Sequence, residues 1–282
     1  MSPPETDSPD IDEPVREGGL DSQAMARPGC PACKGKGTVE RPREDGSIDY
    51  RVCLCVLHTQ RRATARLMIA RRFDPLMRRM TFAAYDPGSA PENLMALRVA
   101  RNFCDSWVQA RREGWVLGLW GTPGCGKTHL ATAMALELTR RFLAKSLVVT
   151  VPNLLRDQRR TFGASERSDV ASPIERAINA DFLVLDDLGA EYLRSREGAR
   201  SEVDWVSEQL YLLLDERLRH DRPTVFTTNY SPTDLQRVLQ ERVSSRLERA
   251  EVMPALEMTK VSARVRTNAG AQNLLTKDRP SS

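Results

Sequence analysis

The stretch that most constrains this chain runs from 121 to 128 and reads Gly-Thr-Pro-Gly-Cys-Gly-Lys-Thr. It matches G-x-x-x-x-G-K-[ST], in which glycines let the backbone wrap closely around phosphate oxygens, because positive φ costs glycine little. The lysine of this pattern reaches the β- and γ-phosphates, and the final hydroxyl holds Mg²⁺. The predicted nucleotide-binding residues of this loop, the P-loop, are Gly121, Thr122, Pro123, Gly124, Cys125, Gly126, Lys127 and Thr128.

The flanking sequence favours a phosphate-binding loop over a plain glycine-rich turn. An apolar run, 115–120, precedes it and has the length of a buried parallel strand. Residues 130–142 follow it and contain good helix formers without Gly or Pro. The loop therefore opens onto a helix N-terminus, whose N–H groups and dipole attract phosphate. We expect ATP and Mg²⁺ to bind here.

Two adjacent carboxylates, Asp186 and Asp187, end a second apolar run. The first can hold Mg²⁺ through water, opposite Thr128. The second is placed to orient or deprotonate the attacking water. Burying two neighbouring carboxylates without a metal is costly, which argues against a purely structural role.

Polar residues after two later segments complete the predicted catalytic set. Asn229 ends the apolar run 224–229, where a short polar side chain can fix the lytic water, although Asn-Tyr-Ser-Pro is also good turn chemistry. Arg242 and Arg246 are four residues apart and share one helix face. A cation that meets the transition-state charge speeds phosphoryl transfer and is often delivered by a neighbouring subunit. Taken alone, the pair reads equally well as a basic helix end.

Apolar runs and helical segments alternate from 115 onward, which predicts an α/β fold with a parallel sheet between helices. Ligands of such sheets bind at the carboxyl ends of the strands. A long helix is expected over 91–112. The expected strands are 115–120, 146–151, 181–187 and 224–229, with a last one inside 252–265.

Four of the six cysteines cluster near the N-terminus, at Cys30, Cys33, Cys53 and Cys55. A C-x₂-C pair followed about twenty residues later by C-x-C can place four thiolates around one tetrahedral Zn²⁺. Two short strands joined by a turn at 44–46 would make a small zinc ribbon, whose folding energy the metal supplies. His58 is an alternative ligand to Cys53 or Cys55, and free thiols in a flexible arm are the alternative to a metal site.

Charge is distributed unevenly along the chain. Residues 3–21 contain seven acidic residues and one Arg, which predicts a disordered acidic tail. Residues 61–79 contain seven Arg and one Asp, which indicates a polyanionic partner such as nucleic acid, or else a solvated helix face. No apolar run approaches the roughly 18 residues of a membrane span, and the start does not read as a signal peptide. We therefore expect a cytoplasmic protein without a membrane partner.

The combination of 121–128, 185–191, 227–229 and 242–247 resembles the AAA+ ATPases of the DnaC/DnaI helicase-loader branch, and the related IstB-type ATPases of transposition. The match covers roughly 80–265, and the cysteine arm resembles the zinc-binding N-terminal region of loaders. The resemblance implies Walker A at the P-loop, Walker B at Asp186 and Asp187, and sensor 1 at Asn229. It also implies an arginine finger at Arg246, with Arg242 as the second candidate.

The same resemblance implies partners. ATP sites would lie between subunits of a ring or spiral, and the N-terminal arm would grip the replicative helicase. A segment that maps onto 153–172 would approach single-stranded DNA, with three candidate contacts: Arg156, Arg159 and Arg160.

Two departures from the family pattern affect the predicted activity. Asp187 stands where many AAA+ enzymes carry Glu, so hydrolysis is weakened or Glu191 contributes. After Arg246 too little chain remains for a full helical lid, so we expect a reduced or absent lid, with Arg264 the nearest sensor 2 candidate. Both departures fit a slow switch better than a vigorous motor.

The sequence therefore predicts an ATP-dependent replicative helicase loader that binds single-stranded DNA and hydrolyses ATP slowly. The alternatives are an IstB-like ATPase that activates a transposase on double-stranded DNA, and a nucleotide-gated DNA-binding adaptor without significant turnover. The expected organisation is a disordered tail at 1–28, a zinc arm at 29–58, an Arg-rich helix and linker at 59–88, an AAA+ domain at 89–268 and a flexible tail at 269–282.

Overall fold

The computed structural model describes residues 22–43, 45–161, 171–190, 200–249 and 252–258. The chain divides into two compact units, Met1–Leu67 and Met68–Ser282. The division falls inside helix α1 (Leu54–Arg72). The predictions for the lid, Glu191, Arg264 and the C-terminal tail lie outside the described residues, as does the part of the predicted 1–28 tail up to residue 21.

The first unit contains the predicted hairpin. Strands β1 (Thr38–Pro42) and β2 (Ile48–Val52) pair antiparallel. Their turn is fixed because the backbone N–H and hydroxyl of Ser47 both donate to Asp45 Oδ1, at 2.9 and 2.6 Å. The buried residues of this unit are few and centre on the cysteines, so its apolar core is small.

The second unit is an α/β domain built on a parallel sheet. The strand order is β4-β5-β6-β3-β7, and each neighbouring pair is parallel. The strands are β3 (Val116–Gly121), β4 (Ser146–Thr150), β5 (Phe182–Asp186), β6 (Thr224–Thr228) and β7 (Val252–Met258). The helices are α2 (Pro91–Asp105), α3 (Trp107–Glu113), α4 (Lys127–Phe142), α5 (Val151–Thr161), α6 (Pro173–Asn179), α8 (Arg200–Arg219), α9 (Pro232–Val238) and α10 (Glu241–Arg249), with a 3₁₀ turn at Met77–Arg79.

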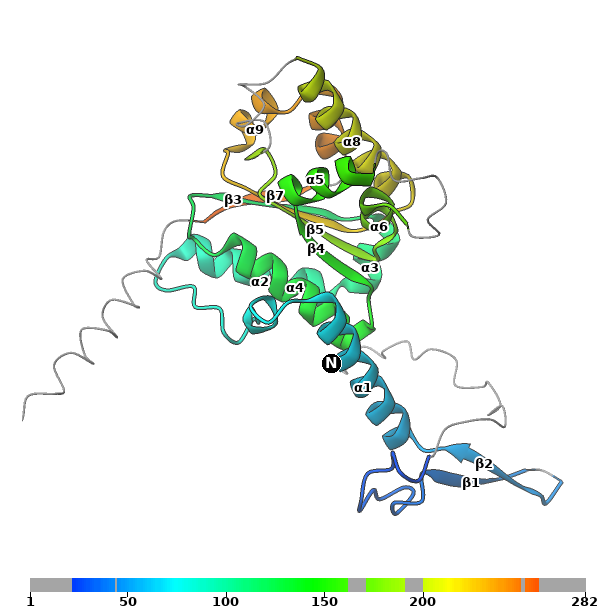
Figure 1. Ribbon diagram of the computed structural model, residues 1–282. Helices are drawn as coiled ribbons and strands as arrows, with labels where there is room; N and C mark the ends of the chain where they lie inside the picture. Colours follow the sequence, from blue (N-terminus) through cyan, green and yellow to red (C-terminus); the bar gives the residue numbers. More distant parts are fainter. Residues whose placement is uncertain (1–21, 44, 162–170, 191–199, 250–251, 259–282) are drawn as a thin grey trace, which may run out of the picture. The chain divides into compact units, whose positions relative to one another are not determined.

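The sheet is covered on both faces, because successive side chains of a strand point to opposite sides. Leu183 and Leu185 of β5 pack in one apolar cluster with α5, α6 and α8, whereas Phe182 and Val184 pack in the other with α2 and α4. Figure 1 shows α2 and α4 on the opposite side of the sheet from α5 and α8. The predicted parallel sheet between helices is confirmed.

One helical segment differs from the sequence-based expectation. The single helix expected over 91–112 is broken at Ser106, so that Trp107 turns into the core against Phe142 and Phe182. The residues after β4 form α5, which buries one apolar stripe, and the chain after Ser231 forms two helices, α9 and α10. No described helix combines the length and apolar character needed to cross a membrane.

Candidate nucleotide site and metal centre

The sheet order brings the predicted catalytic segments to one edge. Strand β6 lies between β3 and β5, with Trp120 paired to Thr228 and Leu185 paired to Phe226. The P-loop, the acid pair and Asn229 follow these three strands at their carboxyl ends. Parallel strands thus place segments a hundred residues apart within hydrogen-bonding distance.

The P-loop has the backbone that phosphate binding requires. Gly124 and Gly126 have φ of 84° and 99°, in the left-handed region that favours glycine. A side chain on Gly126 would lie 2.9 Å from the ring of buried Tyr85, so this position also needs glycine for space. Burial, and to a smaller extent Cys125, raise the pKa of Tyr85 to about 12.

Lys127 is the first residue of α4 and is buried. Its ammonium donates to Gly121 O at 2.9 Å, to Thr122 O at 3.1 Å and to Asn229 Oδ1 at 3.0 Å. The structure therefore joins two of the predicted catalytic residues, Lys127 and Asn229, directly.

Asp186 is a buried acceptor for two hydroxyl groups. Thr128 Oγ1 and Thr227 Oγ1 each donate to Asp186 Oδ1 at 2.7 Å. Thr128 and Asp186, the predicted magnesium ligands, are thus adjacent, and hydroxyl and carboxylate oxygens are ligands that Mg²⁺ accepts. The donor set fits the ion.

Asp187 is less buried and has an unusual backbone, with φ of 58°. Its N–H donates to Thr227 Oγ1 at 3.0 Å. Burial, and then the Asp186 carboxylate, raise the pKa of Asp187 above its ordinary value, and Lys127 opposes this. A raised pKa makes a carboxylate a better proton acceptor near neutral pH.

Arg246 is held by its own subunit. Its Nε lies 2.6 Å from Asp215 Oδ1, its Nη2 donates to Tyr211 Oη at 2.8 Å, and its guanidinium carbon lies 4.8 Å from the Tyr211 ring centroid. The Arg246 side chain is 17% exposed, whereas Arg242 is exposed, with its guanidinium 5.7 Å from the same ring. We call Tyr211 and Asp215 the Arg246 clamp.

The three arginines predicted to contact DNA lie on α5 and are exposed. Arg156 and Arg160 pair with Asp157, at 3.3 and 3.7 Å. Arg159 stacks on Trp205 at 4.5 Å from its ring centroid. All three guanidinium groups thus already have intramolecular partners.

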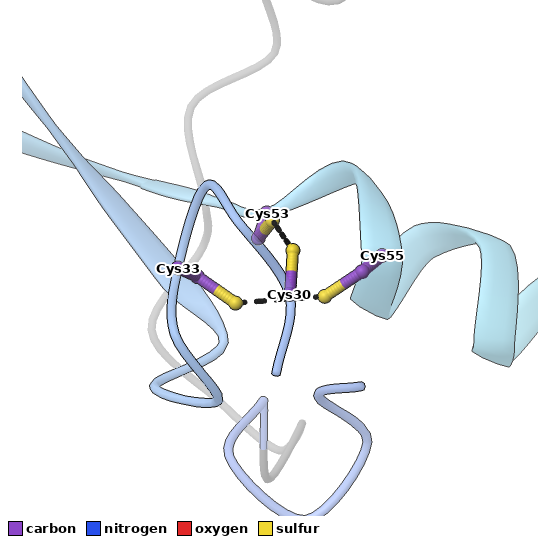
Figure 2. A group of neighbouring side chains, drawn as sticks. All are labelled: Cys30, Cys33, Cys53 and Cys55. Carbon is purple, nitrogen blue, oxygen red and sulfur yellow. Dashed lines mark hydrogen bonds between the residues drawn. The ribbon is translucent and has the colours of Figure 1, made fainter. Parts of the chain in front are cut away.

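The four N-terminal cysteines form a compact group in the first unit (Figure 2). All four Sγ atoms lie within 4.8 Å of one another, with Cys30 to Cys53 at 3.8 Å and Cys33 to Cys55 at 3.6 Å. Four sulfurs at about 2.3 Å from one zinc ion lie about 3.8 Å apart in a tetrahedron. The separations fit a tetrahedral metal and are too long for disulfides.

The backbone prepares the first cysteine pair, Cys30 and Cys33, to act as thiolates. N–H groups of Cys33, and then of Ala32, lower the pKa of Cys30 to about 6. Lys34 and Gly35 have left-handed backbones, and burial of the Cys33 thiol is outweighed by the N–H groups of Gly37 and Gly35, which lower the pKa of Cys33. His58 is exposed and lies outside the four-sulfur group, so Cys53 and Cys55 complete the set.

The sequence did not predict three residues of the site. Thr227 bridges the two acids, and its place two residues before Asn229 on an apolar strand was the available signal. Tyr211 and Asp215 form the Arg246 clamp, and their spacing of four on α8 marks a shared helix face. The spacing of Tyr211 and Asp215 does not identify Arg246 as their partner, because Arg246 lies on another helix, α10.

Comparisons with known proteins agree with this geometry. Residues 117–251 match the family "ATPase family associated with various cellular activities (AAA)". The chain is 26% identical over 212 residues to phage-like element PBSX protein XkdC of Bacillus subtilis, covering 74% of each protein. It is 28% identical over 174 residues to the replicative helicase loader DnaI of the same organism, covering 61% of this chain and 51% of DnaI. The chain thus spans about half the length of that loader.

A crystal structure of the DnaC helicase loader has a similar fold. It superposes with a TM-score of 0.55 at 25% identity, covering 66% of this chain and 99% of the crystallised chain. Residues 117–251 therefore match the AAA ATPases, and the chain is similar in sequence and in fold to the DnaC and DnaI helicase loaders.

Proposed function

We propose that the chain is a cytoplasmic, ATP-dependent loader of a replicative helicase, which binds single-stranded DNA and uses slow ATP hydrolysis as a switch. The observation that carries this proposal is the nucleotide site of a loader-like AAA domain in the same chain as a separate four-cysteine unit. The nucleotide site supplies a switch, and the four-cysteine unit supplies a rigid surface for a protein partner.

In this proposal the P-loop residues bind the phosphates of ATP. Lys127, whose ammonium already lies at the loop, reaches the β- and γ-phosphates. Thr128 and Asp186 would hold Mg²⁺, which would supply positive charge beside the phosphates.

Two residues act on the attacking water. Asp187 accepts its proton, and its raised pKa suits that role. Asn229 orients the same water through its amide, from the end of the strand between the P-loop and the acid pair. Because Asp is shorter than Glu, the base reaches less far, which supports slow turnover.

Arg246 completes a neighbouring subunit's site as an arginine finger, and Arg242 is the second candidate. The clamp holds Nε and one Nη2 proton of Arg246, which leaves the Nη1 end of the guanidinium for a phosphate. Subunits would therefore assemble as a homo-oligomer through the ATP site.

The four-cysteine unit would carry Zn²⁺ and hold the helicase. Metal binding would supply folding energy that its few buried residues do not. In the ATPase domain, Arg156, Arg159 and Arg160 on α5 are the proposed contacts to single-stranded DNA.

The test is ATP hydrolysis by the wild type and by Lys127→Ala, with and without single-stranded DNA. We expect hydrolysis that responds to DNA and disappears in the variant. Tight ATP binding without turnover would contradict the proposed ATPase activity and would support the alternative, a nucleotide-gated adaptor. Delivery of a hexameric helicase onto a single-stranded circle then tests loading, whereas stimulation of a transposase on double-stranded DNA would identify the IstB-like alternative.

A further inference from the structure

A groove of about 520 Å³ in the second unit runs beside β4, the edge strand of the described sheet. Four exposed cations line it: Arg71, Arg72, Lys145 and Arg176. They come from three different segments: the end of α1, the residue that precedes β4, and helix α6. The fold thus gathers charges that the sequence scatters over a hundred residues.

The end of α1 is anchored to the ATPase domain. Phe73 is 2% exposed and packs in the core cluster that contains α2 and α4, and Ile69 packs against the same cluster. Arg78 Nε donates to Phe73 O at 2.9 Å, which fixes the turn after the helix. Arg71 and Arg72 are therefore held at the groove, although they belong to the Arg-rich run of the sequence.

Within the described residues, none of the four groove cations has an ion-pair partner. Nearby carboxylates are engaged elsewhere: Glu175 accepts from the N–H of Ser172 at the start of α6, and Asp181 accepts from the main-chain N–H of Lys145 and pairs with Arg111. The single acid that lines the groove, Asp157, contacts Arg156 and Arg160. Four unpaired cations around one groove repel one another unless an anion lies between them.

The positive surface extends past the groove. Asp157 links the groove to the exposed arginines of α5, so cations continue along the next turns of that helix. A single phosphate or a short acidic side chain would use a part of this surface only. A chain of regularly spaced anions would use all of it.

The floor of the groove indicates how such a chain is bound. Leu147, Val149 and Leu154 are aliphatic, and none of the described residues that line the groove is aromatic, so this lining gives bases no ring to stack on. Arginines bind phosphate through a planar fork and carry no base specificity in that contact. Binding would follow the backbone and ignore sequence.

We propose that this groove binds the phosphate backbone of single-stranded DNA, with Arg71, Arg72, Lys145 and Arg176 as its contacts. The proposal rests on the proposed function and moves the main DNA contact from the α5 arginines, which have partners, to four cations without an ion-pair partner in the part of the chain that the structure describes.

The experiment measures binding of fluorescein-labelled dT₂₀ to the full chain by anisotropy over a salt series. The groove variant is Arg72→Gln/Arg176→Gln. The control is Arg98→Gln/Arg112→Gln, which changes net charge equally at two exposed arginines of α2 and α3 that lie outside the groove. Because each phosphate contact on a single strand contributes about 0.7 to the slope of log K against log salt, the groove variant should lose about 1.4 of slope and the control none.

Further measurements separate charge from structure. Arg72→Lys/Arg176→Lys keeps both charges and should keep the wild-type salt slope. DNA-independent ATP hydrolysis should be unchanged in every variant. If the Gln variant does not fold, bound dT₂₀ should still protect Arg72 and Arg176 of the wild type from phenylglyoxal, as mapped by mass spectrometry.

Equal dT₂₀ binding by groove and control variants would overturn the groove proposal and leave DNA binding by the wild type intact. A wild type that hydrolyses ATP but does not bind dT₂₀ would overturn both the groove and the DNA part of the proposed function. Loss of poly-glutamate binding with unchanged dT₂₀ binding would assign the groove to an acidic protein segment and would also overturn the proposal.

Discussion

Asp187 combines a left-handed backbone with a partly buried charge. Asp and Asn tolerate that backbone better than residues with longer side chains. The departure from Glu at this position therefore has a local reason: the turn after β5 favours a short acid. The same turn aims the N–H of Asp187 at Thr227, which ties the acid pair to β6.

Asp187→Asn should lower the rate of ATP hydrolysis at least about 100-fold, because a general base contributes on the order of 10² to 10⁴ in rate. ATP binding should remain intact. The variant should also unfold at a slightly higher temperature at neutral pH, because a raised pKa means that folding disfavours the charged carboxylate. This gain should shrink as pH falls through the raised pKa, where wild-type Asp187 becomes neutral. Thermal melts at two pH values and single-turnover hydrolysis check both effects.

The control for that substitution is Asp221→Asn. Asp221 also has positive φ, at 48°, but is exposed and remote from the site. It should change neither hydrolysis nor the pH dependence of melting. A wild-type rate of ATP hydrolysis in Asp187→Asn would show that Asp187 is not the general base.

The Arg246 clamp makes a second prediction for single residues. Tyr211→Phe removes the hydroxyl that accepts from Arg246 and should lower kcat about 10-fold with little change in ATP affinity, because a free arginine carries about 2 kcal/mol of rotamer entropy. Arg219→Gln removes the other partner of Asp215, at 2.7 Å, and should leave kcat unchanged. Steady-state kinetics and ATP titrations measure both. If Arg246→Ala keeps the wild-type kcat and Arg242→Ala is inactive, the arginine finger is Arg242.

Elements are joined by one buried arginine that no sequence pattern predicts. Arg217 of α8 is 1% exposed and donates to Ala177 O and Ala180 O at 2.8 Å and to Pro223 O at 2.6 Å. It satisfies carbonyls at the end of α6 and before β6 without a carboxylate partner. Burial, and then Arg222, lower the pKa of Arg217 to about 9.

Arg217→Met should lower the free energy of unfolding by about 3 kcal/mol, because several buried carbonyls lose their donor. Arg219→Met, two residues along the same helix and exposed, should cost little. Urea denaturation followed by circular dichroism measures both. A small loss in Arg217→Met would show that water replaces the guanidinium.

The cysteine unit is expected to depend on metal. Purified protein should contain about one zinc per chain, and Cys53→Ser should lose it, because three thiolates hold zinc less tightly than four. Buried Cys104 lies outside the group, so Cys104→Ser should keep the metal. Elemental analysis measures the zinc, and proteolysis within 38–52 reports the hairpin. Full zinc content in Cys53→Ser would exclude Cys53 as a ligand.

At the scale of elements, strands were more predictable than helices. Each buried strand is a short apolar run bounded by polar residues, so its existence is visible locally. The break at Ser106 and the start of α5 at Val151 depend on where Trp107 and Leu154 find space in the core. Tertiary packing decides these boundaries, and a linear pattern does not contain it.

For the whole molecule, the P-loop, the acid pair and the cysteine spacing predicted the fold and both candidate sites. Each is a short motif whose chemistry depends on neighbours in sequence. The Arg246 clamp and the groove beside β4 were not predictable, because their members come from separate elements and meet only in the folded domain.

Assembly through the ATP site can be tested by mixing subunits. Lys127→Ala and Arg246→Ala should each be inactive alone, whereas an equal mixture should regain hydrolysis at about a quarter of its interfaces, where an intact P-loop meets an intact finger. ATPase rates over a range of mixing ratios measure this. A mixture with no activity above either variant would place Arg246 in its own subunit's structure only.

The hydrogen bonds of Lys127 have a consequence for timing. Its ammonium has three protons, which are shared among Gly121 O, Thr122 O, Asn229 Oδ1 and, at 3.7 Å, Cys125 Sγ. Of the two side-chain acceptors, Asn229 Oδ1 at 3.0 Å lies outside the P-loop, so we expect the amide to rotate away when a phosphate takes its proton. Asn229 would then become available to water when nucleotide arrives. ATP binding would thus release Asn229, the residue that orients the water for hydrolysis of the same ATP.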